Sequence, residues 1–203
     1  MALAAIGAMV ACSGDARAPS DPGHPAGPAF SSPLPMTIGQ TIGAPTYVAG
    51  DSSTGGQGQA VQGIACDGQI PVQHIHVHLT IIANGVQRAV PLAIGAVGSE
   101  VISNFVVDAR CFYWLHTHDA TGIVHVEAPV STAFTLGDFF GIWGEPLSRS
   151  NVGGFQGSVV AYVDSTRYDG DLSALAFQER QQITLIVGSV PDTIPIYAIP
   201  SAF

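Results

Sequence analysis

The feature that most constrains the fold is the segment from His74 to Ala83, which reads HIHVHLTIIA. Side chains alternate between the two faces of a β-strand, so the histidines share one face and the aliphatic residues take the other. Asn84-Gly85 follows, and this pair is a strong hairpin signal because both positions tolerate positive φ. The segment predicts a strand with an apolar core face and a histidine face, followed by a returning strand over 86–92.

Short apolar runs broken by turn residues continue along the chain, and the 24 Gly and 14 Pro favour turns over long helices. A capping-box pattern at Thr135 to Asp138, with Asp in place of Glu or Gln, predicts a short helix over 136–143 that stops at Gly144. Its aromatic residues are expected to pack on a sheet rather than to line a ligand groove. The pattern predicts an all-β chain, a single β-sandwich or small barrel with one short helix. Further strands are expected at 46–48, 61–66, 101–108, 112–115, 123–126, 158–163 and 182–187.

The first 40 residues differ in composition from the rest. Residues 1–12 are apolar and small, and Met9 to Cys12 resembles a lipoprotein cleavage box, although a basic region before it is missing. Residues 13–40 are rich in Pro, Gly, Ser and Ala, which is typical of a disordered linker. We therefore expect an exported protein, lipid-anchored through Cys12 or free in the periplasm or outside the cell, with its β domain at 41–203.

Charge and cysteine content agree with this location. The chain has no lysine, a net charge of −9 and only 10% charged residues, which argues against nucleic acid or an anionic membrane surface as a partner. Membrane contact is expected only through the lipid anchor, and the sequence indicates no particular protein partner. Cys66 and Cys111 remain as an even pair, for which a disulfide is the default in an oxidising compartment.

Six of the seven histidines lie between residues 74 and 125. The second group, His116 and His118, is another pair that projects to one face, and His125 is followed by Glu127 on its own side of a strand. A turn beginning at Asp119 would fold His125 back beside the pair. The two carboxylates could be ligands or could accept the second ring N–H of a histidine. Neutral imidazole suits copper, zinc, nickel and iron, so we expect a metal site formed by His74, His76, His78, His116, His118 and His125.

Three functions are compatible with this pattern. The first is a non-catalytic module that buffers, delivers or senses a metal, with copper favoured over zinc because copper heads the divalent affinity order. The second is a metal-dependent oxidoreductase or hydrolase, with Glu127 or Asp119 as general base. The third is a structural or interaction domain whose histidines respond to acidity without a metal. The sequence leaves open which histidines of the first strand bind.

Two copper-protein families share local features with the chain. Cys111 and His116 have the Cys-x4-His spacing of a cupredoxin loop, but Ala120 occupies the usual position of the axial Met, and Cys111 would have to be a free thiolate. The segment from Tyr113 to His118 resembles the Tyr-Trp-x-His-Ser-His segment of multicopper oxidases. Their His-Cys-His motif is missing, which argues against an oxygen-reducing copper cluster.

The chain also resembles an uncharacterised family of secreted or membrane-anchored bacterial proteins. The shared motifs are HxHxHL…NG, C…LHTHD…GIxHxE and FTLGxFFxxWG, here at 74–85, 111–127 and 134–144. The resemblance covers roughly residues 60–190. It implies that the histidine segments and the short helix form one module, and it implies no particular activity.

Overall fold

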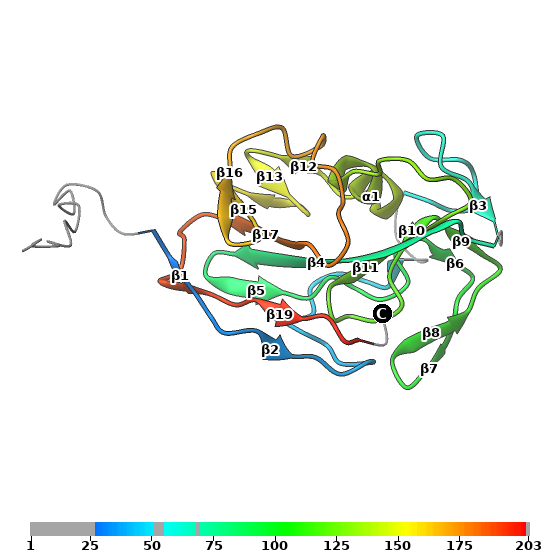
Figure 1. Cartoon of the computed structure of the whole chain (residues 1–203), viewed down its shortest axis with the longest axis horizontal. Helices are drawn as coiled ribbons and strands as arrows, with labels where there is room; N and C mark the ends of the chain where they lie inside the picture. The colour runs from blue at the N-terminus through cyan, green and yellow to red at the C-terminus, as the bar shows by residue number, and fades with distance from the viewer. Residues whose placement is uncertain (1–26, 51–54, 68–69, 202–203) are drawn as a thin grey trace, which may run out of the picture.

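A central mixed sheet organises the molecule (Figure 1). The computed structural model describes residues 27–50, 55–67 and 70–201. The long strand β4 pairs antiparallel with β11 along its first half, antiparallel with β5 at its end, and parallel with β17 on its other side. The strands of this sheet are β10 (Leu115–His116), β11 (Ile123–Ala128), β4 (Gln73–Ala83), β17 (Gln182–Val187), β15 (Val159–Val163), β16 (Thr166–Tyr168) and β5 (Val86–Arg88).

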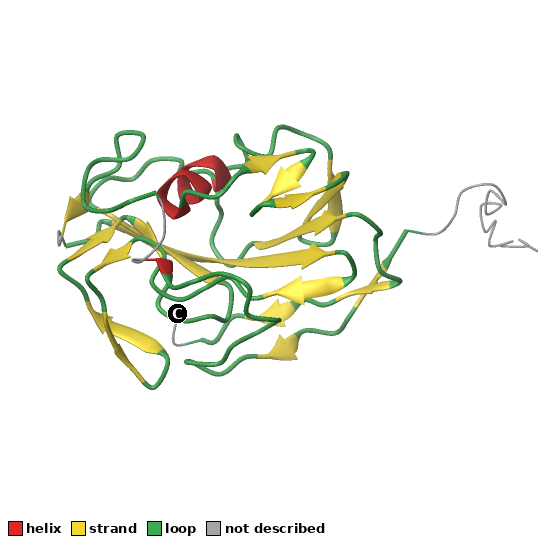
Figure 2. Ribbon diagram, turned by 180° about the vertical axis from the view of Figure 1, so that it is seen from behind, coloured by secondary structure: helices red, strands yellow, loops and turns green. Residues whose placement is uncertain are grey.

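One face of this sheet carries the main hydrophobic core. The aliphatic residues of β4, such as Val77 and Ile81, are fully buried there against the helix α1 (Leu136–Trp143). Figure 2 shows the helix and a small three-stranded sheet lying along the same side of β4. The predicted aromatic packing is confirmed, because Phe139, Phe140 and Trp143 belong to this core. The small sheet consists of β12 (Leu147–Ser148), β13 (Asn151–Val152) and β14 (Phe155–Gln156).

The other face of the sheet carries the histidines, and it is covered by segments that are far apart in sequence. A satellite core around Ile82 and Ile186 occupies one end of this face, and the histidines occupy the other. Parallel pairs β1–β18 and β2–β19 run beneath it (Figure 1). These strands are β1 (Ala29–Phe30), β18 (Thr193–Ile194), β2 (Leu34–Pro35) and β19 (Tyr197–Ala198).

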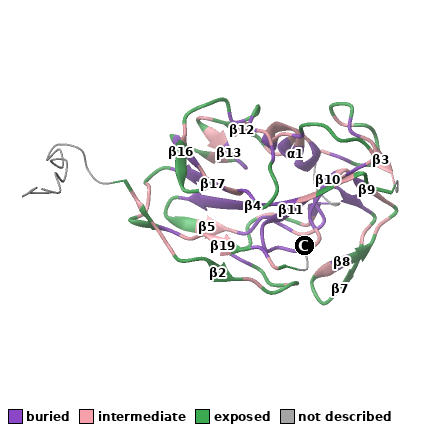
Figure 3. Ribbon diagram, in the orientation of Figure 1, coloured by how far each residue is buried: buried purple, intermediate pink, exposed green. Residues whose placement is uncertain are grey.

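Two further sheets flank the histidine end. In the first, β9 lies between β3 and β6, and the Cys66–Cys111 disulfide joins β3 to β9, as predicted. In the second, β7 and β8 form a hairpin whose outer surface is largely exposed (Figure 3). The strands are β3 (Cys66–Asp67), β9 (Cys111–Tyr113), β6 (Ala96–Val97), β7 (Glu100–Ile102) and β8 (Phe105–Asp108).

The all-β class and the single short helix are confirmed, and the sheets of the described residues form layers rather than a closed barrel. The capping box is present: the Thr135 hydroxyl accepts from the Asp138 backbone N–H, and the Asp138 carboxylate accepts from the Thr135 N–H. The Asn84-Gly85 turn has both φ angles positive, at 53° and 76°. Several expectations differ. Residues 46–48 form no strand, only Cys66 of the expected strand 61–66 lies in one, the returning strand expected at 86–92 ends at Arg88, and 101–108 is the β7–β8 hairpin instead of one strand. The segment expected as a linker up to residue 40 contains the paired strands β1 and β2.

Candidate metal centre

Three neighbouring strands bring the histidine segments together. Pairing of β4 with β11 sets His76 opposite His125, and pairing of β11 with β10 sets His125 opposite His116. The next position along β4 and β11 sets His74 opposite Glu127. The predicted turn before β11 therefore does fold His125 beside the His116 segment. Because all these residues share one face, their side chains converge at the end of the sheet.

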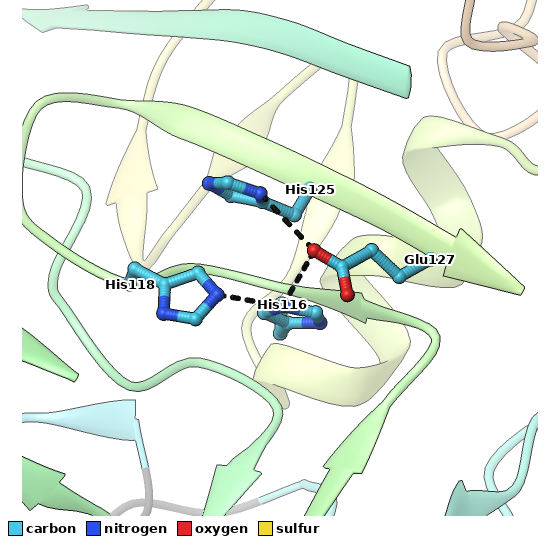
Figure 4. Close-up of side chains that lie close together, drawn as sticks. All are labelled: His116, His118, His125 and Glu127. Carbon is cyan, nitrogen blue, oxygen red and sulfur yellow. Dashed lines mark hydrogen bonds and ion pairs between the residues drawn. The ribbon is translucent and has the colours of Figure 1, made fainter. Parts of the chain in front are cut away.

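Four of these side chains form a compact group, shown in Figure 4: His116, His118, His125 and Glu127. One donor atom from each lies within 4.8 Å of the others. The two Nε2 atoms of His116 and His118 are 3.1 Å apart, and Glu127 Oε1 is 3.8 Å from His116 Nε2. For comparison, a tetrahedral zinc ion with Zn–N bonds of about 2.0–2.1 Å separates its ligand atoms by about 3.4 Å. The group thus has the ligand types and nearly the spacing that an ion of this size requires.

Hydrogen bonds to the backbone fix the ring tautomers of the two closest histidines. His116 Nδ1 donates to the carbonyl of Tyr113 at 2.8 Å, and His118 Nδ1 donates to the carbonyl of Val106 at 2.7 Å. A carbonyl oxygen can only accept, so in each neutral ring the proton is on Nδ1 and the lone pair is on Nε2. Two lone pairs therefore face each other across 3.1 Å and repel each other. A cation bound by both nitrogens removes this repulsion. Such outer hydrogen bonds also orient histidine ligands in metal sites.

The residue between the two histidines holds their backbone in place. Thr117 is fully buried and points to the opposite side of the chain from its neighbours. Its hydroxyl donates to the carbonyl of Pro91 at 2.8 Å and accepts from the N–H of Ile94 at 3.0 Å. These bonds, together with the Thr117 backbone bonds to the same loop, position the His116 and His118 rings.

The turn that returns the chain to β11 depends on two residues. Asp119 Oδ1 accepts from the Thr121 N–H, and its other oxygen accepts from the Gly39 N–H at 2.8 Å. Gly122 has φ of 93°, and a Cβ at this position would lie 2.6 Å from the carbonyl oxygen of Leu79. The turn therefore requires glycine for both its backbone conformation and its close contact with β4.

Burial keeps the central imidazoles neutral. Desolvation, with a smaller contribution from neighbouring histidines, lowers the pKa of His116 to about 3. The same causes lower the pKa of His125 well below its usual value, and burial also lowers the pKa of His76. Neutral imidazole is the form with a lone pair available for a metal. At neutral pH these rings are therefore ready to act as ligands.

The remaining histidines of β4 fall into two environments. His74 and His76 form a second group with His125, again with donor atoms within 4.8 Å of one another, and His74 is half exposed at the mouth of the site. His78 is buried apart from both groups, with Nε2 donating to the carbonyl of Thr121 at 2.9 Å and its ring against that of Tyr197. The three alternating histidines thus share a face but not a role.

Two other predicted site residues are engaged elsewhere. The Asp119 carboxylate is used by the turn, as described above, and belongs to neither group. Cys111 is in the disulfide, so it offers no thiolate, and the cupredoxin arrangement of Cys and His ligands does not apply. Glu127, in contrast, lies among the imidazoles, 3.5 Å from His125 Nδ1 and 3.2 Å from His74 Nε2.

Sequence reasoning did not identify the groups that surround the ligands. Phe105 stacks on the His118 ring, with 4.8 Å between ring centroids and 12° between planes, and Phe112 lies against both His116 and His118. The backbone carbonyls that fix the tautomers belong to Tyr113 and Val106. Every residue has a backbone carbonyl, so the sequence cannot indicate which carbonyls bind the histidines. Only Phe112, close in sequence to the histidine pair, could have suggested aromatic contacts with the rings.

Comparisons of the chain with protein families, curated proteins and solved structures found no match. The resemblance to the bacterial family described above therefore stays a prediction. Among the described residues, no helix is both long and apolar enough to cross a membrane. Cys12 and the expected signal segment, 1–12, lie outside the described residues, as does the expected linker up to residue 26.

Proposed function

We propose that this protein binds a transition-metal ion, copper in preference to zinc, through His116, His118, His125 and Glu127. The observation that carries this proposal is the pair of Nε2 lone pairs facing each other at 3.1 Å, each fixed by an Nδ1–H bond to a backbone carbonyl. His116 is buried and His118 is partly buried, and two acceptors in contact there are costly unless something positive lies between them. A metal ion satisfies both, and the carboxylate of Glu127 offsets part of its charge.

Copper is favoured by the donor set. Three imidazole nitrogens and one carboxylate oxygen suit either ion, and copper(II) stands above zinc(II) in the affinity order for such sites. The Cys66–Cys111 disulfide supports a location outside the cytoplasm, where such bonds persist. Anchoring through a lipidated Cys12 belongs to the same proposal, in which the protein holds or passes on metal at the cell envelope.

A second function is favoured by the open side of the group. Glu127 is about one-third exposed and His74 about half exposed, so solvent reaches the metal position from that side. A metal with an accessible coordination position can activate water, and Glu127 could then act as general base instead of ligand. A metal-dependent hydrolase or oxidoreductase at this site is therefore the alternative to a binding protein.

The experiment is a competition titration of metal-free protein with Cu(II) and Zn(II), combined with electron paramagnetic resonance of the copper form. The variants are His118→Ala and Glu127→Gln, and the matched control is His78→Gln, a buried histidine of the same sheet face outside both groups. We expect nitrogen hyperfine splitting in the spectrum of the native protein. We expect affinity losses of about tenfold or more in the two site variants and no change in the control.

Three results would contradict the proposal. The first is unchanged affinity in both site variants, and the second is an equal loss in the control. The third is native protein that retains no metal after gel filtration. Turnover of a hydrolysable ester or of a phenolic substrate that depends on the added ion would instead select the enzymatic alternative.

A further inference from the structure

The site contains more ligands than one ion can use. Five imidazoles and one carboxylate gather at the end of the sheet, in two groups that have only His125 in common. A four-coordinate ion leaves two of these six side chains unused. His76 is buried like His116 and His125, so it is not simply a solvated surface residue.

The sheet register separates the two groups in space. His76 lies on β4 and His116 on β10, with β11 between them, so their backbones are two strand spacings apart, about 9–10 Å. His76 and His118 belong to no common group of donor atoms that lie within 4.8 Å of one another, whereas the ligand atoms of one tetrahedral ion are about 3.4 Å apart. His125, on the middle strand, contacts both sides, with its ring centroid 4.6 Å from that of His76 and 4.7 Å from that of His118.

Glu127 belongs to the first group and also lies close to a histidine of the second. Its Oε1 is 3.2 Å from His74 Nε2 on one side and 3.8 Å from His116 Nε2 on the other. A carboxylate has two oxygens and can therefore offer one to each of two ions. The Glu179 carboxylate accepts from the backbone N–H of His76 at 2.9 Å. It adds a second negative charge beside the group of His74, His76 and His125.

We propose that the centre is dinuclear, with an inner ion on His116, His118 and His125 and an outer ion on His74 and His76, and with Glu127 between them. This inference rests on the proposed function, because it adds a second ion to the same site. The outer ion is the one nearer to solvent, since His74 is half exposed. It therefore exchanges faster than the inner one, because two ligands of the inner ion, His116 and His125, are buried.

The test measures stoichiometry on the full chain. Metal-free protein is saturated with Cu(II), passed through a desalting column and analysed for copper, and its paramagnetic resonance is integrated. We expect two coppers per chain in the native protein and in His24→Ala, which removes the one histidine outside the sequence range 74–125. We expect one copper per chain both in the double variant His74→Ala/His76→Ala and in His118→Ala. Urea unfolding of each variant checks that it is folded.

The two proposals fail in different ways. One copper per chain in the native protein, unchanged in the His74→Ala/His76→Ala variant, would overturn the dinuclear centre and leave the single-ion site intact. A second copper that disappears in His24→Ala would also overturn the dinuclear centre, because that ion would be bound elsewhere. Native protein that retains no copper at all would overturn both proposals.

Discussion

The buried histidine outside the metal groups should make the protein sensitive to acid. Burial lowers the pKa of His78 to about 4 from its ordinary value of 6.5. The unfolded chain therefore binds a proton on this residue at a higher pH than the folded one. The resulting stability is fully present above pH 6.5 and is lost as the pH falls toward 4. A difference of about 2.5 pKa units corresponds to about 3 kcal/mol, of which about 2.5 kcal/mol is lost by pH 4.5.

The variant His78→Gln isolates this contribution. Its amide can still donate to the Thr121 carbonyl, as His78 Nε2 does at 2.9 Å, but it does not titrate. We expect a stability cost at pH 7.5 of about 1 kcal/mol from imperfect packing and geometry. Between pH 7.5 and 4.5, the variant should lose about 2.5 kcal/mol less than the native protein.

Urea unfolding at a series of pH values, with EDTA to remove metal, measures these free energies. Burial also lowers the pKa values of His76, His116 and His125. Their contributions to the pH dependence of stability are the same in both proteins and cancel in the difference. Parallel stability curves for the native protein and His78→Gln would refute the reasoning. In that case His78 would titrate alike in the folded and the unfolded chain.

Three further changes test the support of the centre. Reducing the Cys66–Cys111 disulfide, which closes a loop of 45 residues, should lower the free energy of unfolding by about 4 kcal/mol on the chain-entropy account, and calorimetry with and without reductant checks this. Gly122→Ala should cost about 2 kcal/mol or more, because its positive φ and the carbonyl of Leu79 oppose a Cβ, and urea unfolding measures the loss. Thr117→Val should cost about 1–3 kcal/mol and weaken copper binding while removing no ligand, as unfolding and competition titration would show.

The parts of the fold that the sequence predicts are those with strong local patterns. The alternation in β4, the Asn84-Gly85 hairpin and the capping box of α1 each depend on neighbouring residues, and all three are confirmed. The two-residue strands such as β18 and β19 have no such pattern, since their pairing depends on partners more than 160 residues away. The strand expected at 46–48 is absent. Apolar residues are present there, but no neighbouring strand pairs with them.

The candidate site shows the same limit. The sequence predicted that His116, His118 and His125 would meet, because a local turn joins their strands. It could not distinguish His76 from His78, since both lie on the same face of one strand. The register makes the difference: His76 faces His125, whereas His78 faces Ile123, and Tyr197 covers its ring. Strand register and contacts between residues distant in sequence are set only when the sheet is assembled, so local sequence patterns do not predict them.

The pairing of β1 with β18 and of β2 with β19 has a consequence for how the molecule is made. Synthesis proceeds from the N-terminus, so Ile194 and Tyr197 emerge long after the β4 residues that they help to cover, Ile82 and His78. Contacts between such distant residues also form slowly. The Ile82 end of this face and the ring of His78 therefore remain uncovered until the C-terminal strands are in place.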